Sequence, residues 1–211
     1  NSIINVPKKY SLKFIQVGNI IREEILNYPN TENKNNEEDT RIIILGGSQG
    51  AKIFGEVIPK AILNLVKKNI KLNILQQVLP EQKDDIELFY KKNMIKNYTF
   101  IFDKNIISLM AKSDLAISRS GASTLAELDF LQIPFIAVPY PHAKDNHQYE
   151  NALYYKKKQS CWILDEINLN EENLTELLLK IISNNDNLFK KKKISKKENE
   201  ALNLIKKEIN I

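Results

Sequence analysis

Residues 41–78 read RIIILGGSQGAKIFGEVIPKAILNLVKKNIKLNILQQV, and this stretch decides the fold. An apolar run of strand length at 41–45 is followed by a segment, 51–68, whose apolar residues recur at helical spacing, and then by a second strand-like run at 71–78. Because the short runs are apolar on both faces, they predict buried strands of a parallel sheet joined by a crossover helix.

The same alternation of short apolar runs and helical periodicity continues along the chain. Further helices are predicted at residues 81–93, 105–113, 124–132 and 146–158, further strands at 98–102, 115–118, 134–138 and 161–164, and helices from there to the end. This order predicts an α/β fold, a Rossmann-like parallel sheet with helices on both faces. Since such sheets bind ligands at the carboxyl ends of their strands, the loops that follow strands are the candidate sites.

The chain divides by composition into four segments. We expect residues 1–27 to end a preceding domain, 28–40 to be a flexible linker, 41–186 to form the main domain, and 187–211 to be a basic C-terminal helix or tail. Within the first segment, residues 13–17 are strand-like and 20–26 are helix-like. Because the chain begins with Asn1 rather than Met, we expect it to be a trimmed or processed piece of a longer protein.

The net charge of +5 belongs to the tail. Residues 187–211 contain eight lysines and three glutamates, so the charges of the other residues balance. The main domain therefore gives no charge-based case for binding nucleic acid. The lysines of the tail predict a solvated helix face, and contact with an anionic lipid surface is the functional alternative.

Cysteine use and hydropathy limit the compartment. Cys161, the one cysteine, lies beside Trp162 in a strand-like run, so no internal disulfide can form, which suits a reducing, cytoplasmic compartment. No apolar run approaches the roughly 20 residues needed to span a bilayer, and no segment of signal-peptide type lies near the start. We expect a soluble protein, with peripheral contact with a membrane left open.

The first loop between a strand and a helix is GGSQGA, residues 46–51. Its three glycines let the backbone approach a ligand closely, and the helix that follows offers free N–H groups to an anion. The loop lacks the lysine of a P-loop and the spacing of the dinucleotide motif. We expect contact with phosphate here, and a tight turn without a ligand is the alternative.

The second loop is SRSGAS, residues 118–123, which also precedes a helix. Thr124 and Glu127 fit the spacing of a capping box, in which Glu127 would only satisfy a backbone N–H. The functional alternative places the Glu127 carboxylate one helical turn inside the anion-binding end of the helix. There it could accept two hydrogen bonds from a ribose diol.

The third loop is YPHAKDNHQYEN, residues 140–151. Asp145 and Gln148 again have the spacing of a capping box. The loop holds both histidines of the chain, five residues apart and with no third histidine, so we expect no metal site. Neutral donors such as Gln148 and Asn151 suit sugar hydroxyls and amide oxygens better than a metal.

Arginine is scarce in this chain, with three residues against 28 lysines. The planar guanidinium of Arg22 or Arg119 is therefore a candidate for recognition of a ligand. Codon bias is the alternative explanation for both positions.

Five motifs in this order resemble the C-terminal half of the MurG family of bacterial glycosyltransferases. They are VGNIIR at 17–22, GGSQGA at 46–51, a phenylalanine in FIFDKNIISLMAKSD at 100–114, SRSGASTLAEL at 118–128 and PHAKDNHQYENA at 141–152. The family transfers N-acetylglucosamine from UDP-N-acetylglucosamine to lipid I in peptidoglycan synthesis. The resemblance, which covers the chain from about Phe14 onward, implies one half of a two-domain GT-B fold, the Rossmann-like half that binds the nucleotide sugar.

The resemblance also implies a donor site spread over these loops. It places Ser48 and Gln49 near the diphosphate and the sugar, and Phe102 or Asp103 beside the uracil. Arg22 closes the site from the linker.

The other implied contacts come from the last two motifs. Glu127 holds the ribose hydroxyls. Along the diphosphate lie Ala122, Ser123 and Thr124, and facing the sugar are His147 and Gln148.

For the intact enzyme the resemblance implies inverting transfer, in which the C4 hydroxyl of the acceptor attacks the anomeric carbon. No Asp-x-Asp motif is present to hold a metal, so we expect neither metal nor cofactor, and stabilisation of the departing UDP falls to helix N-termini and backbone N–H groups. The catalytic base is unknown and is expected in the N-terminal domain, which faces lipid I and is not part of this sequence. The family's place is the cytoplasmic face of the bacterial inner membrane.

Two positions depart from the family, which usually has proline in place of Ile20 and a shorter apolar–aspartate pattern in place of residues 102–105. The second departure leaves open which residue contacts the base. Because the N-terminal domain that faces the acceptor is not part of this sequence, the chain alone should bind a donor without transferring it. A UDP-sugar epimerase of the same fold is one alternative. A non-catalytic module whose lysine tail meets a membrane or a partner is another.

Overall fold

The computed structural model describes residues 19, 21–28, 39–47, 51–158, 161–183 and 207. In this part of the chain six strands form one parallel sheet, in the order β3-β2-β1-β4-β5-β6. The strands are β1 (Thr40–Leu45), β2 (Leu72–Gln77), β3 (Lys96–Phe100), β4 (Leu115–Arg119), β5 (Phe135–Val138) and β6 (Cys161–Ile163). The predicted α/β fold, a Rossmann-like parallel sheet, is confirmed.

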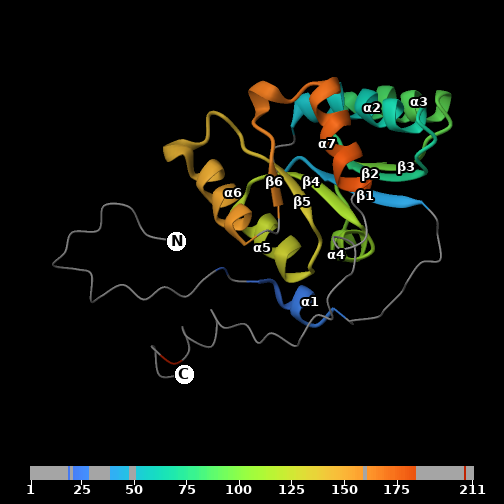
Figure 1. Cartoon of the computed structure of the whole chain (residues 1–211). Helices are drawn as coiled ribbons and strands as arrows, with labels where there is room; N and C mark the ends of the chain where they lie inside the picture. The colour runs from blue at the N-terminus through green and yellow to red at the C-terminus, as the bar shows by residue number, and fades with distance from the viewer. Residues whose placement is uncertain are drawn as a thin grey trace.

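Helices cover both faces of this sheet (Figure 1). They are α1 (Glu23–Leu26), α2 (Lys52–Val66), α3 (Lys83–Lys92), α4 (Ile106–Ala111), α5 (Ala122–Phe130), α6 (His147–Lys157) and α7 (Glu171–Ser183), with short 3-10 turns η2 (Pro80–Gln82), η3 (Lys144–Asn146) and η4 (Glu166–Asn168). Helices α2, α3 and α7 pack on one face, and α1, α4, α5 and α6 pack on the other. The sheet is therefore the middle of three layers.

Strand β1 shows why this sequence makes a central strand. Ile42 and Ile44 belong to the core under α2, α3 and α7, whereas Ile43 and Leu45 belong to the core on the opposite face. Successive side chains of a strand point to opposite faces, so a strand covered on both sides needs apolar residues throughout. Burying each of these side chains stabilises the fold by about 1.5–3 kcal/mol.

The order of the strands creates a switch point between β1 and β4. The chain adds β2 and β3 on one side of β1 and then crosses to add β4, β5 and β6 on the other. The ends of β1 and β4 are neighbours, since Leu45 pairs with Ser118. The two loops that leave these ends separate in opposite directions, and open α/β sheets bind their ligands in the crevice that results.

Several predicted elements differ from the structure in their bounds, two of them as follows. The strand predicted at 98–102 ends at Phe100, because its last pairing with β2 joins Phe100 to Gln77. The helix predicted at 20–26 is a single turn that begins at Glu23, since the backbone of Arg22 is extended.

Three predicted segments lie wholly or largely outside the described residues. They are the strand at 13–17, the linker at 28–40 and the basic tail at 187–211. None of the described helices is long and apolar enough to cross a bilayer.

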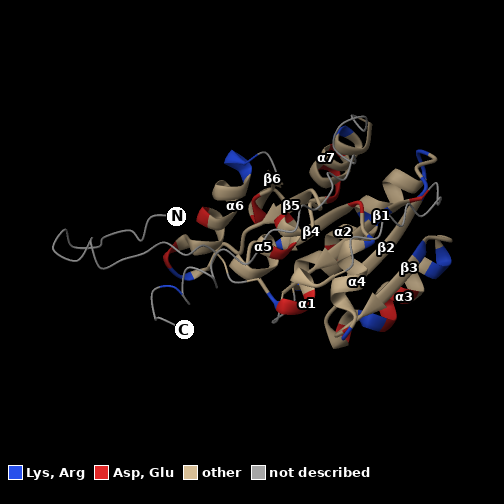
Figure 2. Ribbon diagram, turned by 90° about the horizontal axis from the view of Figure 1, so that it is seen from below, with Lys and Arg blue, Asp and Glu red and all other residues tan. Residues whose placement is uncertain are grey.

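Basic and acidic residues are interspersed along the described part of the chain (Figure 2). Helix α3 shows the pattern, with Asp84 and Asp85 in its first turn and Lys91 and Lys92 in its last. This arrangement places each charge at the end of the helix dipole that it stabilises.

Candidate functional site

The loop after β1 brings a glycine turn to the edge of the switch point. Gly47 has a φ of +81°, a left-handed conformation that glycine adopts without strain. Ser48 and Gln49, both predicted donor contacts, lie outside the described residues. The N-cap residue of helix α2 is Ala51. Its side chain cannot accept a hydrogen bond from the first N–H groups of the helix.

The loop after β4 leads into α5, whose N-cap is Gly121. The capping-box interpretation of Thr124 and Glu127 is therefore wrong, because the helix begins earlier and Thr124 is already inside it. Ala122, Ser123 and Thr124 form the first turn at the end of the helix that favours anions, as the prediction requires. Their contact with a diphosphate stays a prediction.

Glu127 forms a bidentate ion pair with Arg22. The Arg22 Nε donates to Oε1 at 2.6 Å and Nη2 donates to Oε2 at 2.8 Å. The Glu127 side chain is 8% exposed and that of Arg22 is 48% exposed. Hydrogen bonding to the carboxylate raises the pKa of Arg22 above its ordinary value, so the guanidinium stays charged. The sequence predicted both residues for the site but not that they contact each other.

The segment that carries Arg22 is fixed to the domain at several points. Ile25 is 1% exposed and packs in the core beneath α4, α5 and α6. The Asn19 Nδ2 donates to the Tyr155 hydroxyl at 3.1 Å on α6, and the Tyr28 hydroxyl lies 3.4 Å from the Ser108 hydroxyl on α4. Arg22 therefore approaches Glu127 from a segment that is anchored on both sides of it.

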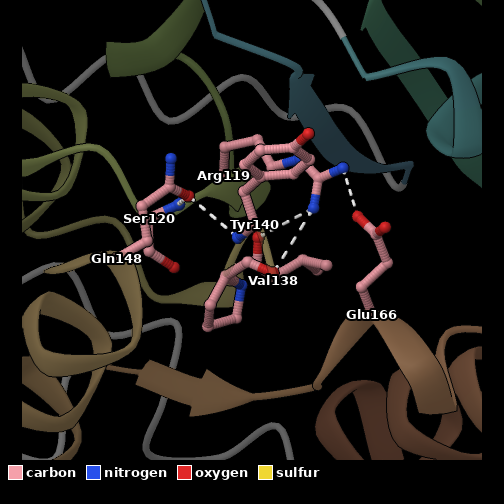
Figure 3. A network of polar contacts seen from close by, with 7 residues as sticks. Arg119, Ser120, Val138, Tyr140, Gln148 and Glu166 are labelled. Carbon is pink, nitrogen blue, oxygen red and sulfur yellow. Dashed lines mark hydrogen bonds and ion pairs between the residues drawn. The ribbon is translucent and has the colours of Figure 1, made fainter. Parts of the chain in front are cut away.

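Helix α6 braces the loops after β4 and β5. The Gln148 Oε1 accepts hydrogen bonds from the backbone N–H groups of Ser120, at 3.2 Å, and Tyr140, at 3.0 Å (Figure 3). Asn151 Nδ2 donates to the Ser120 carbonyl at 3.0 Å. The capping-box interpretation of Asp145 and Gln148 is wrong, because the N-cap of α6 is Asn146 and the Gln148 side chain bonds elsewhere.

The exposed part of this loop holds the other residue predicted to face the sugar. His147 is the first residue of α6 and is exposed, with Nδ1 2.8 Å from the Lys144 carbonyl oxygen. That contact orients the ring and leaves Nε2 on the far side of it. Asn151, in contrast, uses a donor within the protein, so the interpretation of Asn151 as a sugar contact is weakened.

The loop after β3 separates the two candidates for the uracil contact. Phe102 is 82% exposed, so its ring is open to stacking. Both oxygens of Asp103 are engaged, one accepting from the Tyr98 hydroxyl at 2.8 Å and the other from the Asn105 N–H at 2.7 Å. Asp103 therefore shapes the loop, and Phe102 is the better candidate for contact with a base.

Neither histidine joins a metal-binding group in the part of the chain that the structure describes, where no three His, Cys, Asp or Glu side chains gather. Three residues near the site, Ser120, Tyr140 and Glu166, were not predicted from the sequence. Glu166 forms an ion pair with Arg119. The one sequence signal near this pair was the scarcity of arginine, which indicated Arg119 and not Glu166.

A six-stranded parallel sheet with a glycine turn and polar loops gathered at its switch point defines the class of the protein. It is the Rossmann-like, C-terminal half of a GT-B glycosyltransferase fold. Residues 41–208 match the model of the glycosyltransferase family 28 C-terminal domain, and the chain belongs to this family. The resemblance to MurG glycosyltransferases is thereby confirmed at the level of the family.

Known relatives and structures agree with this assignment. The chain is 39% identical over 194 residues to the UDP-N-acetylglucosamine--N-acetylmuramyl-(pentapeptide) pyrophosphoryl-undecaprenol N-acetylglucosamine transferase of Pelagibacter ubique, covering 92% of this chain and 53% of the relative. Acinetobacter baumannii MurG has a TM-score of 0.71 at 23% identity, over 84% of this chain and 51% of that one. A UDP-GlcNAc 2-epimerase from Neisseria meningitidis, bound to UDP-GlcNAc, has a TM-score of 0.54 at 13% identity, covering 83% of this chain and 45% of the epimerase. The chain spans about half the length of the curated relatives it matches.

Proposed function

We propose that this chain is the donor-binding half of a glycosyltransferase that moves N-acetylglucosamine from UDP-N-acetylglucosamine to lipid I. The observation that carries the proposal is the buried Glu127 carboxylate on α5, oriented by Arg22 beside the switch point. A carboxylate that is held in place and not used as a helix cap suits a pair of ribose hydroxyls. The relatives that share the family are named for this transfer.

Glu127 keeps the capacity to accept hydrogen bonds from a ribose. Each carboxylate oxygen has about two acceptor sites, and Arg22 occupies one on each oxygen. The guanidinium therefore fixes the plane of the carboxylate without exhausting it. On this proposal Arg22 serves the site by positioning Glu127, which adds to the role implied by the resemblance, that of closing the site.

The leaving group would be stabilised by fixed dipoles. The N-termini of α2 and α5 follow two neighbouring strands, and neither has a side-chain cap from its N-cap residue. Oriented N–H groups at these ends stabilise the charge that develops on the departing UDP and need not reorganise during the reaction. The acceptor site and the catalytic base belong, on this proposal, to the other half of the longer protein, working at the cytoplasmic face of the membrane.

Calorimetric titration of the chain with UDP-N-acetylglucosamine tests the proposal, with UDP-glucose and ADP-glucose as controls. We expect selective binding of the first ligand. Glu127→Gln should weaken binding, whereas Glu172→Gln, an exposed carboxylate on α7, is the matched control and should not. A folded chain that does not bind UDP-N-acetylglucosamine, or a Glu127→Gln variant that binds it as tightly as the parent, would refute the proposal.

The epimerase alternative is favoured only by likeness of fold, which the Neisseria meningitidis structure shares. Release of free UDP from UDP-N-acetylglucosamine without an acceptor would support it. The scaffold alternative requires that nucleotide binding be absent and that the chain associate tightly with anionic vesicles. Neither result is expected if the chain is the donor-binding half of a transferase.

A further inference from the structure

Arg119, the last residue of β4, ties together the ends of three neighbouring strands (Figure 3). Its Nη1 lies 3.4 Å from the Val138 carbonyl oxygen and 3.5 Å from the Pro139 carbonyl oxygen, at the end of β5. Its Nη2 forms an ion pair with Glu166 in η4, which follows β6. One guanidinium therefore reaches the segments that leave β4, β5 and β6 on the side of the sheet that holds the site.

The same guanidinium lies against two aromatic rings. Its central carbon is 4.9 Å from the ring centre of Phe54, in the first turn of α2, and 5.4 Å from that of Tyr140, in the loop after β5. Arginine suits this position because its planar group donates in several directions while its faces stack on rings. A lysine ammonium could not make the same set of contacts.

The charge of Arg119 is already matched and largely enclosed. The Arg119 side chain is 11% exposed and that of Glu166 is 21% exposed. A cation that is paired with a carboxylate and withdrawn from solvent contributes little net attraction to a diphosphate. The contacts therefore point to a role in placing the loops and not in binding phosphate.

The loops that Arg119 holds are the ones that orient Gln148. Tyr140, whose ring Arg119 contacts, and Ser120, the next residue in the chain, both donate their backbone N–H to the Gln148 Oε1. With its oxygen fixed in this way, the direction of the side-chain amide of Gln148 is set by these two loops. A shift of either loop would turn that amide.

We propose that Arg119 is a positioning residue that holds Gln148 on the sugar side of the donor site and so sets how strongly the chain prefers UDP-N-acetylglucosamine to UDP. This inference rests on the proposed function and adds a residue that acts through another. It predicts a specific signature. Loss of Arg119 should weaken binding of the sugar nucleotide more than binding of UDP.

The test measures the dissociation constants of UDP-N-acetylglucosamine and UDP for Arg119→Met, Arg119→Lys and Glu166→Gln. In both Arg119 variants the preference for the sugar nucleotide should fall roughly tenfold, because a displaced contact loses about that much or more, and the Glu166 variant should shift it less in the same direction. Arg41→Met is the matched control, since Arg41 lies near the start of β1, at the end of the strand away from the site, and it should keep the parent's preference. Retention of the preference by Arg119→Lys, or equal weakening of both ligands, would overturn the inference.

A second measurement needs no ligand. Amide hydrogen exchange at Ser120 and Tyr140 should be faster in Arg119→Met than in the parent, while exchange at the core residue Ile43 is unchanged. Unchanged exchange at Ser120 and Tyr140 would overturn the positioning role even if the protein bound no nucleotide. Failure of the proposed function is distinguishable, because it would appear as absence of UDP-N-acetylglucosamine binding by the parent chain.

Discussion

The ion pair between Arg22 and Glu127 should be measurable as a coupling free energy. The perturbations are Arg22→Met, Glu127→Gln and the double variant, which form a double-mutant cycle. Methionine keeps much of the apolar stem of arginine, and glutamine keeps the shape of glutamate. The cycle therefore isolates the charged contact from the packing around it.

The magnitude follows from how unequally the two partners are buried. Exposed pairs are worth about 0.2–1 kcal/mol, and breaking a buried pair from one side costs about 3–5 kcal/mol. Glu127 is 8% exposed but Arg22 is 48% exposed, so solvent screens one end of the contact. With two hydrogen bonds at 2.6 and 2.8 Å, we expect a coupling free energy of about 2 kcal/mol.

The single variants should differ in a predictable direction. Arg22→Met strands a buried carboxylate and should lower the free energy of unfolding by about 3 kcal/mol. Glu127→Gln leaves a guanidinium that can reach water, and the amide still offers one acceptor, so its cost should be nearer to about 1 kcal/mol. Equilibrium unfolding in urea, followed by the fluorescence of Trp162, the single tryptophan, gives each value.

Two outcomes would refute this reasoning. A coupling free energy below about 0.5 kcal/mol would mean that the contact behaves as an ordinary surface pair. Equal costs for the two single variants would mean that the burial of Glu127 does not govern its energetics. Repeating the cycle in high salt separates these outcomes from screening, because the coupling of a buried carboxylate should persist.

Three further predictions concern stability. Gly47→Ala should cost about 1 kcal/mol, measured by urea unfolding, because φ is +81°, a conformation that strains a residue with a side chain, while no atom of the described residues lies within 4 Å of the added methyl group. Tyr90→Phe should cost about 1–3 kcal/mol, because it removes the 2.5 Å hydrogen bond to the buried Gln76 Oε1, and Gln76→Leu in the same background should recover part of that loss in the same assay. Burial raises the pKa of the Cys161 thiol from 9.0 to about 12, so its contribution to stability should be fully present below pH 9 and be lost as the pH rises from 9 toward 12. Cys161→Ala should reduce this dependence of the free energy of unfolding on pH. The buried thiol should also react with a disulfide reagent at pH 8 only after unfolding.

Much of the fold could be predicted because its signals are local. The apolar triplet Ile42–Ile44 indicates a strand covered on both faces whatever its neighbours are. The end of β3 could not be predicted in the same way. Ile101 and Phe102 continue the apolar run, yet the strand ends at Phe100, where its pairing with β2 ends. Strand length depends on a partner that lies elsewhere in the chain.

In the candidate site, too, local features could be predicted and contacts between distant residues could not. Glycine loops and the charge of Glu127 are visible in short motifs, but whether Glu127 belongs to a capping box depended on where α5 begins, and the N-cap of that helix is Gly121. The pairing of Arg22 with Glu127 joins residues 105 positions apart, and local spacing carries no trace of it. The scarcity of arginine indicated Arg119 as a candidate but gave no sign of its partner Glu166. The two meet only because β4, β5 and β6 pair side by side in the sheet.

If Glu127 serves the proposed donor site, its contact with Arg22 also links that site physically to residues 21–28. A ligand that binds the Glu127 carboxylate changes the free energy of the contact between Glu127 and Arg22. By reciprocity, a change in how strongly residues 21–28 are bound to the domain changes the affinity for that ligand. The segment has other anchors, since Ile25 is buried in the core and Asn19 bonds to α6. Its response to a ligand is therefore limited to an adjustment around Arg22 while those anchors hold. On the proposed function, occupancy of the ribose site would therefore be transmitted to residues 21–28 through the contact between Arg22 and Glu127.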